Sequence, residues 1–222
     1  MRLNEVMQRS EAQVLEINKV LRNTYALLSM TLLFSAATAG LSMMMNMGPM
    51  NPFLTLIGYF GLLFLTTKYS QSSTGLIFVF ALTGFMGLTL GPILNMYLTF
   101  MSNGAELIMT ALGGTGIIFL GLSGYVLTSR KDFSFLGGFL MVGILVAFLA
   151  GLGGMLFSIP ALSLAVSAMF ILLMSGMILY QTSEIIHGRE NNYILATISL
   201  YVSIYNLFLS LLHILGAFSG DD

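Results

Sequence analysis

The chain has 222 residues, of which 57% are hydrophobic and 8% are charged, and its formal net charge is −1. A soluble globular domain carries roughly 25% charged residues, so this composition excludes a soluble fold and indicates an integral membrane protein. The lack of cysteine excludes a disulfide framework, thiolate catalysis and a cysteine-ligated metal site. The net charge argues neither for nor against nucleic acid, and we expect the lipid bilayer rather than nucleic acid as a partner.

Residues 1–22 form a polar segment that mixes both charge signs, and we interpret it as a cytoplasmic tail. It lacks the early apolar run and small-residue cleavage site of a signal peptide. Near heptad spacing relates five apolar residues: Leu3, Met7, Val14, Ile17 and Leu21. This spacing favours a short amphipathic helix, whereas the polar composition and the interrupting Ser10 fit a solvated, partly frayed tail equally well.

Seven apolar segments follow, at about residues 23–45, 52–68, 75–98, 105–128, 133–157, 160–187 and 193–217. Most reach the ~20 residues needed to cross a bilayer as a helix, and the second is at the short end. Backbone polar groups in lipid must be satisfied within one segment, which favours helices. A β-barrel would need alternating rather than continuous apolar stretches. We therefore expect an all-α transmembrane domain over residues 23–217 and a short external tail, 218–222.

The basic residues predict the orientation of these helices. All 8 of them fall on one side of the membrane if the chain crosses seven times. They are Arg2, Arg9, Lys19, Arg22, Lys68, Arg130, Lys131 and Arg189. The loops at 46–51, 98–105 and 158–159 carry no Lys or Arg. The positive-inside rule then places the N-terminus in the cytoplasm and the acidic C-terminus outside.

Glycine is spaced for close helix packing in the third, fourth and fifth segments. The residues concerned are Gly84, Gly87 and Gly91, then Gly121 and Gly124, then Gly143, Gly151 and Gly154. Small residues let helix backbones approach in lipid, so we predict tight helix contacts at all three sets. Pro92 follows Gly91 and predicts a kink or an early helix end. A simple end is favoured over a broken helix that lines a transport site.

Polar residues in the last two segments form the candidate site. A single helical face of the seventh segment carries Ser199, Ser203, Asn206, Ser210 and His213. Such a stripe in a membrane-spanning helix must face other helices or a watery cleft. The sixth segment adds Gln181, Glu184 and His187 near its end. We therefore predict a polar cleft between the sixth and seventh helices.

Two kinds of chemistry are weighed at these residues. Glu184 and His187, on one helix face, have side chains able to bind a cation or relay protons. A capped, partly solvated helix end, with Glu184 paired to a basic residue, is favoured instead. His213 is interpreted as a hydrogen-bonded residue between helices. With 2 His far apart and no HExxH pattern, we expect no metal site and no cofactor.

Residues 121–124, Gly-Leu-Ser-Gly, match the GxSG string around the nucleophile of rhomboid-type intramembrane proteases. A serine nucleophile needs a base within hydrogen-bond reach. Ser123 and His187 fall on the same predicted side of the membrane, but the other rhomboid features are missing. Intramembrane proteolysis is therefore a distant alternative, and we expect no enzyme.

Several separated motifs share one family pattern. They are Val20–Ser29 (VLRNTYALLS), Gly84–Asn95 (GFMGLTLGPILN), Ser129–Ser134 (SRKDFS), Glu184–Gly188 (EIIHG) and Ser199–Phe208 (SLYVSIYNLF). Together they resemble the Bax inhibitor (TMBIM) family, from about Val20 to Gly216. The resemblance implies a seven-helix bundle with the last helix central. It also implies one of two activities.

The first implied activity is that of the bacterial members of the family, which associate in the inner membrane with the AAA protease FtsH and restrain it. For that activity the tail, residues 1–19, is the expected partner-binding segment. The second is a pH-sensitive leak of Ca²⁺ or H⁺, gated by paired acids on the sixth and seventh helices. At those two positions this chain has Gln181 and Ser203. Neither titrates near neutral pH or supplies a carboxylate to a hard cation, so the first activity is favoured.

Overall fold

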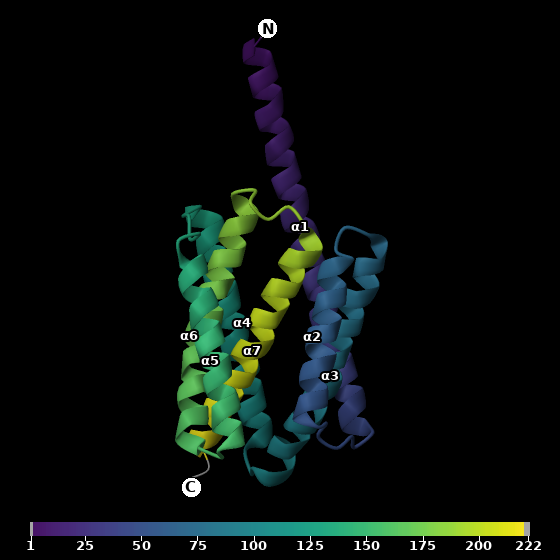
Figure 1. The fold of residues 1–222 in the computed structure, drawn as a ribbon, viewed down its shortest axis with the longest axis vertical. Coiled ribbons are helices and arrows are strands. Elements are labelled where there is room, and N and C mark those ends of the chain that lie inside the picture. The colour runs from purple at the N-terminus through teal and green to yellow at the C-terminus, as the bar shows by residue number, and fades with distance from the viewer. Residues whose placement is uncertain (1, 220–222) are drawn as a thin grey trace. The chain divides into compact units, whose positions relative to one another are not determined.

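The computed structural model describes residues 2–219, with side chains from residue 14 onward, and these residues form seven α-helices and no strand. The helices are α1 (Arg2–Met44), α2 (Pro52–Lys68), α3 (Ser73–Phe100), α4 (Gly104–Ser129), α5 (Leu136–Leu156), α6 (Pro160–Ile186) and α7 (Tyr193–Ser219) (Figure 1). In the described residues, 6 are long and apolar enough to cross a membrane, and α2 is a shorter apolar helix. The predicted all-α, seven-helix membrane fold is thus confirmed. The orientation of the termini stays a prediction.

Helix α1 is longer than the first apolar segment. It runs without interruption for 43 residues, so the polar residues before the first span continue the same helix rather than forming a frayed tail (Figure 1). Of the expected partner-binding tail, Met1 and the side chains up to residue 13 lie outside the described residues. From Val14 onward the side chains are described, and Glu16 and Lys19 are exposed on the helix surface.

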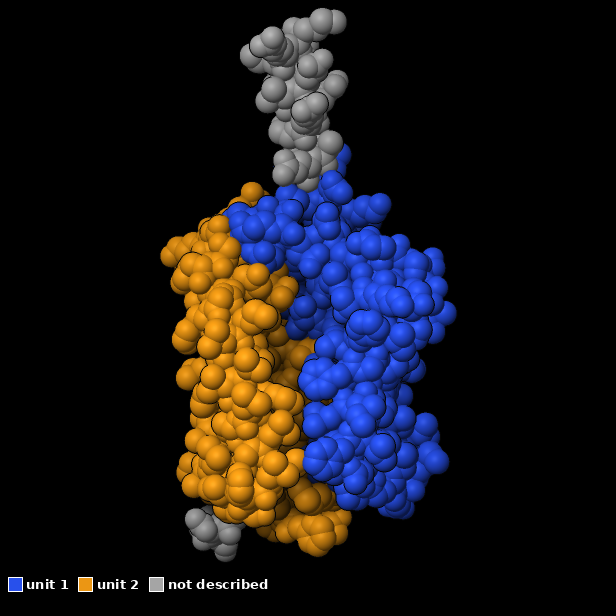
Figure 2. All heavy atoms as spheres, viewed as in Figure 1, with its two compact units in different colours: residues 1–93, 184–201 blue, residues 94–183, 202–222 orange. Residues whose placement is uncertain are grey.

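The chain divides into two compact units, coloured separately in Figure 2. Unit 1 comprises Met1–Ile93 and Glu184–Tyr201, and unit 2 comprises Leu94–Ser183 and Val202–Asp222. Helices α1 and α2 therefore belong to unit 1, and α4 and α5 to unit 2. Helices α3, α6 and α7 each contribute residues to both.

Helices α1 and α3 pack closely against each other in unit 1. A Cβ added at Gly87 would collide with the Ser35 carbonyl, and one added at Gly84 would lie 2.7 Å from the Phe34 ring. At Gly91 an added Cβ would lie 2.6 Å from Ser42. The tight contact predicted at these three glycines is confirmed, because only a residue without a side chain lets the two backbones come this close.

Pro92 lies inside α3, which continues to Phe100, so the predicted early helix end is wrong. Proline has no N–H to donate to the carbonyl of Leu88, one turn earlier. The buried Ser42 of α1 donates its hydroxyl to that carbonyl at 2.9 Å. A neighbouring helix thus supplies the missing donor. The hydrogen bond from Ser42 explains how α3 continues past Pro92, because an unpaired Leu88 carbonyl would be costly in lipid.

Unit 2 has its apolar core between α5, α6 and α7. Its buried residues are Leu140, Ala147, Leu173, Met174, Ile178 and Leu207. An added Cβ at Gly143 would lie 2.6 Å from Leu173, and one at Gly154 would lie 3.2 Å from Ser163. The predicted tight contact is therefore confirmed at Gly143 and Gly154, whereas a Cβ added at Gly151 would make an ordinary contact with Val166 at 3.5 Å. The same prediction for Gly121 and Gly124 of α4 is wrong, because an added Cβ there would meet nothing within 4 Å.

Helix α7 is the most buried of the candidate membrane spans. In its most apolar stretch 61% of the residues are buried, against 17% to 39% in the other five spans. Lipid-facing helices keep one side exposed, so a helix buried to this extent is surrounded by protein. The burial agrees with the central position that the family resemblance implies.

Candidate functional site

The first half of α7 is held in unit 1 by hydrogen bonds to other helices. Tyr201 is 1% exposed, and its hydroxyl donates to the Thr83 carbonyl of α3 at 3.3 Å. The same hydroxyl lies 2.6 Å from the Ser35 hydroxyl of α1. Because the tyrosine has one proton to give, Ser35 acts as the donor when Tyr201 bonds Thr83. One phenol thus joins α1, α3 and α7.

A second buried contact lies nearer the start of α7. The Thr197 hydroxyl is 2.7 Å from the Tyr193 carbonyl of its own helix and 3.2 Å from the Thr24 carbonyl of α1. Both threonines are fully buried. This hydroxyl therefore ties α7 to α1 a second time, about one turn before Tyr201.

Asn192 fixes the entry into α7. Its side-chain oxygen accepts from the backbone N–H of Ile194 at 2.9 Å and of Leu195 at 3.3 Å, as an N-cap residue does. Its side-chain nitrogen donates to the Ser70 carbonyl, between α2 and α3, at 3.1 Å. Asn192, Thr197 and Tyr201 are all absent from the sequence-predicted site. Of these three residues, only Asn192 could have been predicted from the sequence, because an asparagine directly before an apolar helical run is typical of an N-cap.

The turn that ends α6 is closed by its own residues. Gly188 has a φ of 70°, a left-handed conformation that favours glycine. The Glu184 carbonyl accepts from the backbone N–H of Arg189 at 2.9 Å and of Glu190 at 3.1 Å. The Arg189 Nε also donates to the Glu184 carboxylate at 2.6 Å. The structure therefore pairs Glu184 with Arg189, while the nearby His187 is partly buried.

Unit 2 contains the rest of the α7 stripe. Ser203 and Ser210 are 1% and 7% exposed. Asn206 is partly buried, and its side-chain nitrogen donates to the Val202 carbonyl of its own helix at 2.9 Å. His213 Nδ1 lies 2.8 Å from the Ser167 hydroxyl of α6, which is also 3.1 Å from the Ser163 carbonyl. When Ser167 donates to that carbonyl, His213 must be protonated on Nδ1.

The eight predicted site residues divide between the two units. Unit 1 holds Glu184, His187 and Ser199, and unit 2 holds Gln181, Ser203, Asn206, Ser210 and His213. None of the five stripe residues on α7 is exposed, and Gln181 is partly buried. The stripe thus lies against protein for the most part. That these residues line one cleft between α6 and α7 stays a prediction.

The proposed nucleophile of the protease alternative faces another hydroxyl. Ser123 is 3% exposed, and its Oγ lies 3.4 Å from the Thr182 Oγ1 of α6. A threonine hydroxyl cannot act as the base that an acyl-transfer serine needs. Among the described residues, no group of three or more His, Asp or Glu side chains is placed to hold a metal ion. The geometry therefore favours a structural role for Ser123.

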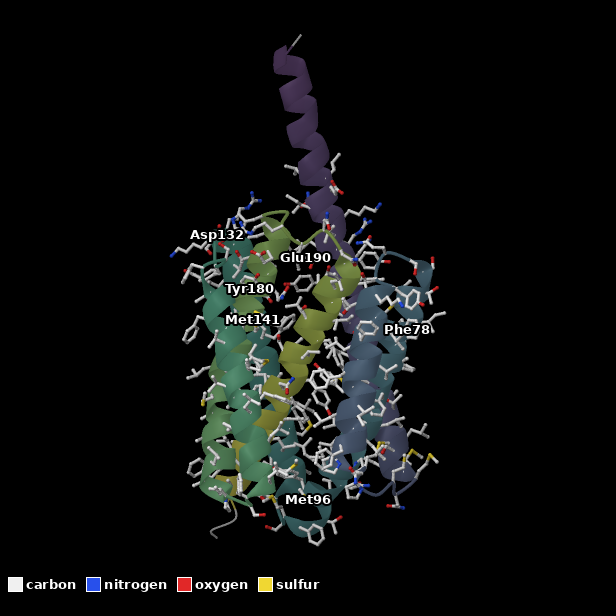
Figure 3. All side chains as sticks on the ribbon, viewed as in Figure 1. Phe78, Met96, Asp132, Met141, Tyr180 and Glu190 are labelled. Carbon is white, nitrogen blue, oxygen red and sulfur yellow. The ribbon has the colours of Figure 1, made fainter. Side chains whose placement is uncertain are left out.

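The connection between α4 and α5 is fastened to the last turns of α6. The Ser183 hydroxyl accepts from the Phe133 N–H at 2.9 Å, and the Asp132 carboxylate, labelled in Figure 3, accepts from the Ser134 N–H at 2.9 Å. Lys131 is fully exposed, and its hydrogen bond with Tyr125 raises its pKa. This basic connection is therefore fixed in shape and stays cationic at neutral pH.

Comparison with known proteins agrees with the sequence motifs. The family model described as "Inhibitor of apoptosis-promoting Bax1" matches residues 17–220. The chain is 54% identical over 208 residues, 94% of each protein, to the "Modulator of FtsH protease YccA" of Escherichia coli strain K12. It is equally similar to the "Inner membrane protein YccA" of Escherichia coli O6:H1. It is 57% identical over 211 residues, 95% of each protein, to an uncharacterised protein of Pseudomonas aeruginosa PAO1.

Proposed function

The chain belongs to the Bax inhibitor family, and on that premise we propose that it is a multi-pass inner-membrane protein that associates with an FtsH-type protease and restrains its proteolysis of membrane proteins. The observation that carries the proposal is the similarity, along nearly the whole chain, to the relative named as a modulator of that protease. The proposed role is regulatory and needs no catalytic centre of its own.

The arrangement of α1 supports a restraining role. An ATP-driven protease extracts a membrane protein by pulling on an exposed segment, and the polar start of α1 is the segment that we propose it engages. The same helix is anchored in unit 1 through Ser35, Thr24 and the glycine contacts with α3. Buried hydrogen bonds and close backbone packing raise the cost of extraction, because both must be lost before α1 leaves its neighbours. A protease that binds the start of α1 but cannot extract the helix would remain bound to this chain and would degrade other substrates more slowly.

Two measurements test this function. The tagged full-length chain should co-purify with the FtsH-type protease from membranes, and it should slow degradation of a membrane substrate when both proteins share a liposome. A variant lacking residues 2–12 should show weaker restraint, because the segment to be engaged is shortened. Unchanged restraint by this truncated protein would remove the tail from the mechanism. A full-length chain that neither binds nor slows the protease would refute the function itself.

The ion-leak alternative has no comparable support. The two positions at which the family resemblance places titrating acids hold Gln181 and Ser203. An amide and a hydroxyl keep their charge state across physiological pH. We therefore expect liposomes that contain the purified chain to show no proton-dependent Ca²⁺ flux. A flux that Gln181→Ala abolishes would favour the leak.

A further inference from the structure

A small pocket lies in unit 1, between α1 and the connection from α6 to α7. It is lined by Glu16, Ile17, Val20, Gly188, Glu190 and Asn191 and has a volume of about 100 Å³. Glu190, labelled in Figure 3, belongs to the connection that follows α6. The pocket is separate from the polar stripe of α7, and its walls come from the polar end of α1 and from a turn.

Among the described residues that line the pocket, two carry carboxylates and none is basic, and one of these carboxylates is held in place by a hydrogen bond. The Glu190 carboxylate accepts from the backbone N–H of Asn192 at 2.8 Å. Asn192 is itself buried and bonded to α7 and to Ser70, so this carboxylate is anchored to a fixed part of unit 1. Glu16 brings a second carboxylate from α1. Two acceptors therefore approach the same small volume from different elements.

Within the part of the chain whose side chains are described, the neighbouring basic residues Lys19, Arg22 and Arg189 do not line this pocket. The Arg189 Nε is engaged by Glu184, on the other side of the turn. Lys19 and Arg22 of α1 are exposed. The aliphatic side chains of Ile17 and Val20 complete the wall. The pocket thus offers an apolar wall together with two carboxylates, a combination that suits a flexible cation with a hydrocarbon stem.

The volume of the pocket limits which ligand can enter it. About 100 Å³ accommodates the end of one side chain and is too small for a nucleotide or a lipid chain. Next to Glu16, Val14 and Leu15 are 57% and 70% exposed and give apolar surface that a protein interface can cover. We propose that this pocket receives a lysine or arginine side chain of the partner protease. This inference rests on the proposed function and assigns one contact surface to it.

The first test removes the two charges and keeps the shape. In the double variant Glu16→Gln with Glu190→Gln, the new amide at position 190 still has a carbonyl oxygen to accept from the Asn192 N–H. The protease that co-purifies with the full-length chain should fall about tenfold, because both carboxylates that pair with the partner's cation lose their charge, although Glu16 is exposed in the free chain. Glu106→Gln, an exposed acid in the first turn of α4, is the matched control and should change nothing.

The second test locates the partner. Because the chain has no cysteine, Asn191→Cys introduces a single thiol at the exposed rim of the pocket. A thiol-attached benzophenone at this position should crosslink to the protease on illumination, whereas one at Ser102→Cys should not. A crosslink only to a second copy of the chain would overturn the assignment of the partner.

The two tests separate the pocket from the function. If the unchanged chain captures the protease and the double glutamine variant captures it equally well, the pocket inference fails and the proposed function stands. If the unchanged chain captures no protease, both fail. Loss of capture in the double variant alone, with its melting temperature in detergent unchanged, supports the pocket.

Discussion

Helices α3 and α4 carry similar sets of glycines, and the structure uses them in opposite ways. Gly87 and Gly91 of α3 lie against the backbone of α1, whereas Gly121 and Gly124 of α4 face open space. The difference lies in the partner helix. Opposite Gly87 and Gly91, α1 presents Ser35, Thr38 and Ser42, whose small polar side chains allow a close approach. Glycine spacing alone therefore predicts a contact only where a matching helix is available.

The strongest test of this comparison enlarges one glycine in each helix. Gly87→Leu should cost about 3 kcal/mol or more, because the new side chain meets the Ser35 backbone, which cannot move aside as a flexible side chain would. Gly124→Leu is the matched control and should leave stability nearly unchanged. Thermal unfolding followed by circular dichroism suits this chain, which has no tryptophan. Equal melting temperatures for the two variants would contradict the difference between α3 and α4.

The next test addresses the hydroxyl that supports Pro92. Ser42→Ala leaves the Leu88 carbonyl without its donor and should destabilise the protein by about 1–3 kcal/mol. In a Pro92→Ala background, residue 92 regains an N–H for that carbonyl, so the same Ser42→Ala change should cost clearly less. A four-variant cycle of unfolding free energies in detergent measures this coupling. Costs that agree in both backgrounds would mean that Ser42 does not replace the proline donor.

A smaller effect is expected where α7 reinforces the contact between α1 and α3. Tyr201→Phe removes the hydroxyl that bonds Ser35 and Thr83 and should cost about 1–2 kcal/mol. The exposed Tyr69 offers a control, because Tyr69→Phe keeps the ring that stacks on Phe78. The two melting temperatures should differ by several degrees. Indistinguishable values would show that the buried hydroxyl contributes little.

The smallest effect should have the opposite sign in the two helices. Gly121→Ala fills no occupied space and improves helix propensity, so it should stabilise α4 by up to about 1 kcal/mol. Gly91→Ala should destabilise, because its Cβ would lie 2.6 Å from Ser42. Comparing the sign of the two changes, rather than their size, makes this measurement robust to small errors. Stabilisation by both would contradict the close contact at Gly91.

The number of helices could be predicted from the sequence because lipid imposes a strict rule on backbone hydrogen bonding, and each apolar run shows that rule directly. The course of α3 past Pro92 could not, since the donor that replaces the missing N–H comes from Ser42, far away along the chain. Local preference at a proline says nothing about a neighbouring helix. The open glycines of α4 could not be predicted for the same reason.

The polar contacts of α7 could also be predicted only in part from the sequence. Periodicity selects one face of a helix, and the stripe from Ser199 to His213 is that face. Tyr201 lies between two stripe residues and points to another side, yet it makes the contacts to α1 and α3. A helix buried on most of its surface has polar partners in several directions, so a single stripe describes only part of them. Asn192 was within reach of prediction, because an N-cap leaves a local signal.

The unbroken course of α1, from Arg2 to Met44, determines how the protein responds to mechanical load. A pull on the N-terminus acts along the helix axis and is transmitted into the glycine contacts of α3 without a slack linker. The contacts to Ser35, Thr38 and Ser42 are then loaded in shear, all at once, rather than peeled apart one after another. Shear geometry requires a larger force than peeling for the same set of bonds. A hinge of flexible residues inserted between residues 13 and 14 would leave these contacts intact, yet it would alter the direction in which they are strained.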